Sequence, residues 1–235
     1  DDYWTDPLKL QMQVDCLEKD PSLSLVYHNV EYKFEGEESK TILAFPTAGQ
    51  AGGLPSPAPV TNFHDILKGR LIPTLSVVYR AAFLREYPKW ITGLPVGDWP
   101  IFLLLLQRGP GLYLDRNMGV YRQHAQGVWS SQNSVQTTKG CLRTAFAIKQ
   151  NIPMGAEDRR ELYHGLWVQV LHCVEKLIRE RRAGAALSVL HDYAWSFPAQ
   201  ALTNAYVYHL LAKAFGQAVM EGLRFGKSVG GGQHG

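Results

Sequence analysis

Apolar residues follow different periods in the two parts of the chain. Residues 23–34 are rich in β-branched and aromatic side chains, which predicts a strand, and residues 35–60 are rich in Gly, Pro, Ser and Ala, which predicts a long loop. After about residue 135, apolar residues recur every three or four positions, the period of one helix face. The clearest such run is Leu162, Leu166, Val170, Cys173 and Leu177. We therefore expect a mixed α/β part followed by an all-helical part.

Capping and breaker residues set the expected limits of the other elements. Asp6 and Pro7 suit a helix start, and Asp20-Pro21 ends that helix. The apolar run over 99–107 predicts a helix buried on most sides. The other expected elements are a short helix from Asn62 to Lys68, a buried strand over 73–80, short strands near 112–114 and 119–122, and helices over 183–195 and 199–225.

The last expected helix carries an apolar stripe with a strict four-residue spacing. The stripe comprises Leu211, Phe215, Val219 and Leu223. It predicts a helix that packs into a core. A helix lying on a membrane surface is the alternative, because Lys213, Arg224 and Lys227 are nearby in the sequence.

Composition narrows the class of protein. The 235 residues are 46% hydrophobic and 11% aromatic, enough apolar material for a core. The net charge of +3 is not gathered into a basic block, so it gives little support to nucleic-acid binding. The three cysteines form no CxxC pair, so neither a zinc site nor a disulfide framework is indicated. A reducing compartment fits this pattern best. The longest apolar run, Ile101 to Leu106, is far below the roughly 20 residues that span a bilayer.

The first two residues are candidates for metal binding. Asp1 and Asp2 stand immediately before the expected helix start at Asp6. Two adjacent carboxylates at the end of a strand can hold a hard divalent cation against a phosphate. The alternative is a solvated acidic turn, because carboxylates favour helix starts in any case.

Four motifs occur in an order that resembles a known family. They are Asp1-Asp2-Tyr3-Trp4 with Asp6-Pro7, then Ile72-Pro73-Thr74-Leu75-Ser76 leading to Arg80, then Leu94-Pro95-Val96-Gly97-Asp98-Trp99-Pro100, and finally Tyr121-Arg122-Gln123-His124 with Gly127-Val128-Trp129-Ser130. Over residues 1 to about 131, the chain resembles the second half of the catalytic domain of the family 2 glycosyltransferases. The resemblance implies an α/β fold, a partial GT-A (Rossmann-like) nucleotide-sugar transferase domain, followed by an α-helical region.

The resemblance also implies a reaction and roles for three carboxylates. The family uses a nucleotide-sugar donor, usually with Mn²⁺ or Mg²⁺, and transfers the sugar with inversion to an acceptor hydroxyl. Asp1 and Asp2 match the acidic metal motif, with Asp2 as the direct ligand, and Asp98 matches the catalytic base. Capping of the following helix is the alternative role for Asp98, and one carboxylate can serve both roles.

The other candidate site residues could instead have purely structural roles. His124 matches a family histidine that contacts the metal or the diphosphate, and Arg122 is a candidate phosphate contact. Arg122 can instead pair with a carboxylate on a strand. Trp99 and Trp129 are candidates for acceptor binding, with core packing as the alternative.

The resemblance defines the expected organisation. Residues 1–132 match the C-terminal half of the catalytic domain, residues 133–226 form a helical region, and residues 227–235 form a flexible tail. No segment matches the family's N-terminal nucleotide-binding half, so the 235-residue piece alone is expected to be inactive and to expose a sheet edge.

The expected function is that of an inverting hexosyltransferase in cell-surface polysaccharide or glycan biosynthesis. Its partners would be a nucleotide-sugar donor and a glycan or lipid-linked glycan acceptor, with self-association or peripheral membrane contact through the helices. The expected location is the cytoplasm or the inner face of the membrane. The alternative is a catalytically inactive glycan-binding or scaffold protein with the same fold.

Overall fold

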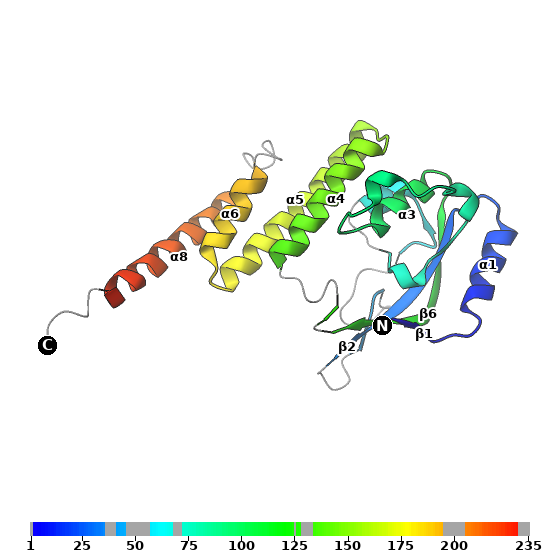
Figure 1. Cartoon of the computed structure of the whole chain (residues 1–235), viewed down its shortest axis with the longest axis horizontal. Helices are drawn as coiled ribbons and strands as arrows, with labels where there is room; N and C mark the ends of the chain where they lie inside the picture. Colours follow the sequence, from blue (N-terminus) through cyan, green and yellow to red (C-terminus); the bar gives the residue numbers. More distant parts are fainter. Residues whose placement is uncertain are drawn as a thin grey trace. The chain divides into compact units, whose positions relative to one another are not determined.

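The computed structural model of the chain describes residues 2–35, 41–45, 57–67, 72–124, 126–127, 134–194 and 205–229. The chain divides into two compact units (Figure 1). Unit 1 comprises Asp1–Asn133 and Gly140–Leu162, and unit 2 comprises Ser134–Lys139 and Tyr163–Gly235. The protein is of the mixed α/β class, with one mixed sheet and several helices.

Unit 1 is built on a six-stranded sheet. Its strands are β1 (Tyr3–Trp4), β2 (Leu25–Phe34), β3 (Thr41–Leu43), β4 (Val60–Thr61), β5 (Val78–Tyr79) and β6 (Gly111–Gln123). The main strand order is β1-β6-β2-β3, while β4 pairs with β6 and β5 pairs with β2. The two long strands, β2 and β6, run parallel, and the other pairs are antiparallel. Residues 25–30 of β2 are buried, as expected for a strand covered on both faces.

The helices of unit 1 follow the predicted limits closely. They are α1 (Lys9–Lys19), α2 (Phe63–Leu67), α3 (Asp98–Leu106) and the 3₁₀ turns η1 (Thr74–Ser76), η2 (Ala81–Phe83) and η3 (Lys89–Ile91). The prediction that α3 is buried on most sides is confirmed, since Phe102, Leu103 and Leu105 are at most 5% exposed.

Two strand predictions in unit 1 were correct only in part. The expected strand over 73–80 is a 3₁₀ turn followed by only Val78–Tyr79, because the Pro73 carbonyl accepts hydrogen bonds from both the N–H and the hydroxyl of Ser76. The two expected short strands near 112–114 and 119–122 are one continuous strand, β6. The polar stretch between them stays in the sheet through register shifts opposite Asn29.

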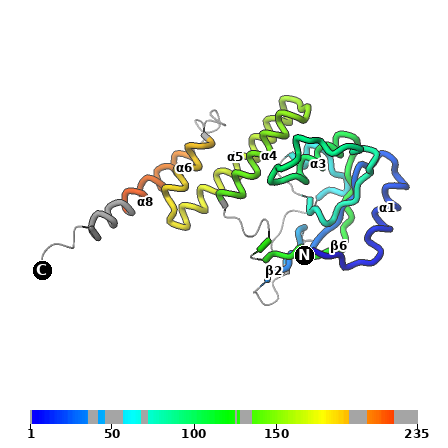
Figure 2. The backbone as a smooth tube through the Cα atoms, in the orientation of Figure 1, coloured from blue at the N-terminus to red at the C-terminus, as the bar shows by residue number. Residues whose placement is uncertain are grey.

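The helical region consists of α4 (Ser134–Asn151), α5 (Ala156–Arg179), α6 (Ala183–Ala194) and α8 (Ala205–Val229). Residues 140–162, from α4 and the start of α5, belong to unit 1, where the Thr144 hydroxyl accepts the N–H of Val96. The predicted stripe on α5 is confirmed, because its five residues are at most 4% exposed. In unit 2, α6 and α8 lie side by side (Figure 2). No helix within the described ranges is both long and apolar enough to cross a membrane.

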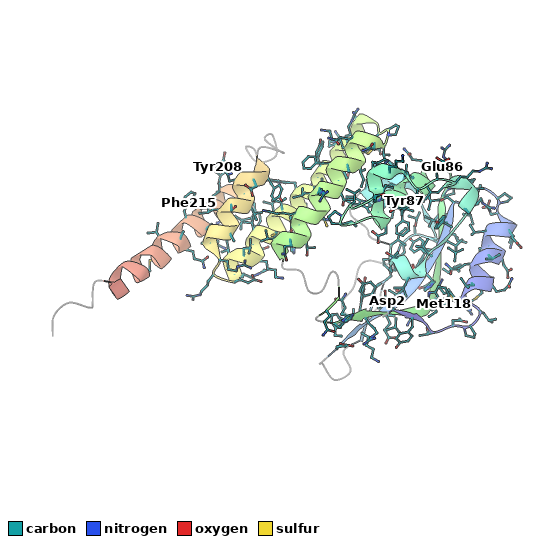
Figure 3. The ribbon with its side chains drawn as sticks, in the orientation of Figure 1. Asp2, Glu86, Tyr87, Met118, Tyr208 and Phe215 are labelled. Carbon is teal, nitrogen blue, oxygen red and sulfur yellow. The ribbon has the colours of Figure 1, made fainter. Side chains whose placement is uncertain are left out.

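The core stripe predicted for the last helix was wrong. α8 buries Val207, Leu210 and Ala214, while Phe215 and Val219 are 57% and 59% exposed. Phe215 and Tyr208 project from α8 (Figure 3). A strict four-residue spacing advances about 40° per step around a helix of 3.6 residues per turn, whereas alternating steps of three and four stay on one face. α8 extends to Val229, and the rest of the predicted tail lies outside the described residues.

Candidate active site

The strand pairing at the beginning of the chain places Asp2 beside the end of β6. Tyr3 pairs with Val120 and Trp4 with Gly119, both antiparallel. Asp2 is exposed at this end of the sheet (Figure 3), and its Oδ1 accepts the backbone N–H of Arg122 at 3.0 Å. The carboxylate is therefore held in place by the backbone of a strand that is distant in the sequence.

Asp98 begins α3, one residue after the capping position Gly97. A carboxylate in the first turn interacts favourably with the helix dipole. Its Oδ1 accepts the N–H of Trp99 at 2.8 Å, and its Oδ2 accepts the hydroxyl of Thr74. Both oxygens of this half-buried carboxylate are thus oriented by neighbouring groups.

The charges of Asp2 and Asp98 both influence the pKa of Tyr121. Burial raises the pKa of Tyr121, and the negative charges of Asp2 and Asp98 raise it further. Burial likewise raises the pKa of Tyr32, with smaller contributions from Tyr121 and Asp2. The rings of Tyr32 and Tyr121 meet edge to face, with centroids 5.3 Å apart. The two predicted carboxylates, which come from separate motifs, thus both lie within electrostatic range of Tyr121.

The charge of Asp98 also affects the pKa of a cysteine in the helical region. Burial raises the pKa of the Cys141 thiol, and the charge of Asp98 raises it further. Cys141 lies on α4, within the part that belongs to unit 1. The neighbourhood of Asp98 thus includes a residue from outside the motifs that predicted the site.

The structure places Arg122 and His124 on and just after the end of β6. The Arg122 guanidinium pairs with the carboxylate of Glu35, which corresponds to the structural alternative considered for this residue. The carbonyl of His124 accepts the N–H of Gly127 at 3.0 Å, so His124 begins a turn after the strand. Their contacts with a phosphate or a metal remain predictions.

Trp99 is buried. Its side chain is 4% exposed, and its Nε1–H donates to the carbonyl of Ile66 at 3.3 Å. These contacts favour the core-packing alternative over acceptor binding. Trp129 and Asp1 lie outside the described residues.

The donor chemistry of Asp2 suits a hard divalent cation. Carboxylate oxygens are the ligands that Mg²⁺ and Mn²⁺ prefer, and Asp2 is exposed at the sheet end. Among the residues that the structure describes, no group of three or more His, Cys, Asp and Glu side chains could hold a metal ion. The ligand set of Asp1, Asp2 and His124 remains a prediction, because Asp1 is outside those residues.

Sequence reasoning missed the part that η1 plays at this site. Thr74 donates to Asp98, the Leu75 carbonyl accepts the indole N–H of Trp4 at 3.0 Å, and the Ser76 carbonyl accepts Gln13 Nε2 at 2.8 Å. One turn therefore connects α3, β1 and α1. The available signal was the position of these three residues inside the second of the four motifs.

Comparison with known proteins gives relatives without a stated activity. No family model matches the chain. Over 131 residues it is 33% identical to "Uncharacterized protein Mb1547" of Mycobacterium bovis and to "Uncharacterized protein Rv1520" of Mycobacterium tuberculosis. The aligned segment covers 56% of this chain and 35% of each relative. The chain therefore spans about a third of the length of the curated relatives it matches.

Proposed function

We propose that the protein is an inverting glycosyltransferase of GT-A type that moves a sugar from a nucleotide-sugar donor to an acceptor hydroxyl. The observation that carries this proposal is that the fold orients both predicted carboxylates, Asp2 through the N–H of Arg122 and Asp98 through Thr74 and the N–H of Trp99. The two carboxylates come from separate motifs and lie far apart in the sequence. The order of the four motifs supports the same assignment.

In the proposed reaction, Asp98 is the general base. It takes the proton of the acceptor hydroxyl as that oxygen attacks the anomeric carbon, and the bond from this carbon to the diphosphate breaks with its electron pair leaving on the diphosphate. Thr74 and the N–H of Trp99 orient the carboxylate. Asp2 would hold the Mn²⁺ or Mg²⁺ ion. That ion would neutralise charge on the departing nucleoside diphosphate.

A specific observation keeps a second function in view. Both Asp98 oxygens accept hydrogen bonds within the protein, as expected of a carboxylate that only braces a helix start. A non-catalytic glycan-binding or scaffold protein would retain this arrangement without turnover. In cell-surface glycan assembly, such a protein would hold the same acceptors.

Asp98→Asn separates the two functions, because the amide keeps the shape of the carboxylate but cannot accept the proton. In the native protein that carries this sequence, we expect transfer to fall about 10²- to 10⁴-fold while donor binding stays unchanged. Asp15→Asn, at an exposed position on α1, is the matched control and should transfer normally. Normal transfer by Asp98→Asn would exclude Asp98 as the base.

Donor binding has its own test in thermal melts of the same native protein with UDP, GDP, CDP and dTDP, each with and without Mn²⁺. A nucleotide at about 100 times its Kd stabilises a protein by roughly 2.7 kcal/mol. We expect one nucleotide to stabilise only with the metal, and Asp2→Ala to abolish that shift. Stabilisation by none of the four would count against the metal-dependent mechanism.

A further inference from the structure

A cavity of about 410 Å³ lies beside β1 and the start of α1. It is lined by Trp4, Thr5, Asp6, Pro7, Lys9 and Leu10. Trp4 is 53% exposed although it belongs to the sheet. The cavity thus joins an accessible indole to a hydroxyl, a carboxylate and an ammonium group.

Lys9 is the unusual member of this set because its side chain is 1% exposed. Its Nζ donates to Gln13 Oε1 at 2.8 Å and lies 4.2 Å from the centroid of the Trp4 ring. Burial lowers the pKa of Lys9 to about 8. With Gln13 as its hydrogen-bond partner and the indole ring beside it, Lys9 supports Trp4 from the buried side and offers almost no accessible surface to a ligand.

Two contacts hold the Trp4 side chain in one orientation, one at the indole nitrogen and one on the face of the ring. Its Nε1–H donates to the Leu75 carbonyl at 3.0 Å, and Lys9 packs over the ring. Asp6 Oδ1 accepts the N–H of Leu8 at 2.8 Å, and a carboxylate has further lone pairs for other donors. An ordered, half-exposed aromatic ring beside the hydroxyl of Thr5 and the carboxylate of Asp6 suits a pyranose. The C–H face of the sugar can pack on the indole while its hydroxyl groups both accept and donate.

The cavity is linked to the carboxylates of the proposed active site through β1 and η1. Trp4 follows Asp2 by two residues, so in an extended strand the two side chains lie on the same face, about 7 Å apart. Leu75, which holds Trp4, directly follows Thr74, which holds Asp98. A ligand in the cavity would therefore be separated from Asp98 by one 3₁₀ turn.

We propose that this cavity is a subsite for a pyranose unit of the acceptor glycan, with Trp4 as the stacking surface and Thr5 and Asp6 as hydroxyl contacts. This inference rests on the proposed transferase function, because it assigns the bound sugar to the acceptor. It concerns binding alone and adds no chemical step.

The test is direct binding of saccharides to the intact chain. Cellobiose, lactose, N,N′-diacetylchitobiose and α-1,6-mannobiose are titrated while the indole N–H signal of Trp4 is followed by NMR. We expect a saturable shift with at least one of them. Trp4→Leu should weaken that binding about tenfold and Thr5→Val by a smaller factor, whereas Trp4→Phe should retain most of it.

Tyr87→Leu is the control, since Tyr87 is 54% exposed and lies outside the residues that line the cavity. No shift with any saccharide, or wild-type binding by both Trp4→Leu and Thr5→Val, would overturn the subsite. Circular dichroism shows whether each variant is folded, and Thr5→Val keeps the test decisive if Trp4→Leu is not.

The outcomes separate this inference from the function on which it rests. Metal-dependent nucleotide binding without saccharide binding would overturn the subsite and leave the transferase proposal standing. Saccharide binding that depends on Trp4, without nucleotide binding, would support the cavity as a sugar site and count against transfer.

Discussion

Unit 1 buries polar side chains that bind backbone groups far away in the sequence, whereas unit 2 buries mainly apolar side chains along its helices. In unit 1, Gln13 Nε2 donates to the carbonyls of Val26 at 2.7 Å and Ser76 at 2.8 Å. In unit 2, the buried residues of α5 include Val170, Val174 and Leu177, each 0% exposed. The charged pairs of α5 lie at its surface, where such pairs contribute little to stability.

This difference indicates where positioned chemistry is expected. Asn29 accepts the N–H groups of Val30 and Phe45 and donates to the Phe45 carbonyl, which ties β2 to the residues after β3. Arg80 donates to the carbonyls of Leu17 and Leu23. Such bonds have directions as well as energies, so they hold separate segments in one register. A site assembled from distant residues requires that precision.

The largest effect is expected at Gln13. Gln13→Met leaves two buried carbonyls and the Lys9 ammonium without this partner, so the free energy of unfolding should fall by roughly 3 to 5 kcal/mol. Urea denaturation measures this loss. Gln11→Met is the matched control on the same helix, since Gln11 is exposed, and should change stability by less than about 0.5 kcal/mol. Equal values for the two variants would remove the contrast between the units.

The next effect is a pH dependence at His28, which is 0% exposed. Burial lowers its pKa from 6.5 to about 4; the Asn29 carbonyl opposes this shift and the charge of Lys9 adds to it. Between these two values, the unfolded chain binds more protons than the native protein, so stability is lost as the pH falls. By pH 4, this titration should have lowered the free energy of unfolding by about 3 kcal/mol relative to neutral pH.

His28→Leu should flatten that part of the stability curve. Urea midpoints at pH 7, 6, 5 and 4 measure the slope, and the difference from wild type isolates His28 from the carboxylates. His209→Asn, at an exposed position on α8, is the control substitution. A wild-type slope in His28→Leu would show that His28 does not titrate in this window.

Thr74 should affect turnover more than stability, because it is exposed and its hydroxyl orients Asp98. Thr74→Val should lower kcat roughly 10- to 100-fold, less than Asp98→Asn, since the proposed base would be present but misplaced. Thr74→Ser restores the hydroxyl and should restore kcat. A change confined to KM, or no rescue by Thr74→Ser, would argue against a positioning role for Thr74.

The same contrast explains which features the sequence predicts. The α5 face is readable because spacings of four, four, three and four average close to the helical period. The contacts of Thr74 with Asp98, of Trp4 with Leu75 and of Asp2 with Arg122 join residues 24, 71 and 120 positions apart. No local pattern in a single sequence encodes such pairs. The motifs supplied candidate residues, but the pairing of β1 with β6 was needed to bring Asp2 beside Arg122.

The smallest effect is expected on the exposed side of α8, where the sequence pattern was misleading. Phe215→Ser should change the free energy of unfolding by less than about 0.5 kcal/mol, because the ring is 57% exposed. Leu210→Ala, on the same helix but 1% exposed, should cost about 2 to 5 kcal/mol. Thermal melts of both variants measure the contrast. A large loss for Phe215→Ser would mean that the four-residue stripe is covered after all. The stability of unit 2 would then depend on contacts of Phe215, and the burial of Val207, Leu210 and Ala214 alone would not account for it.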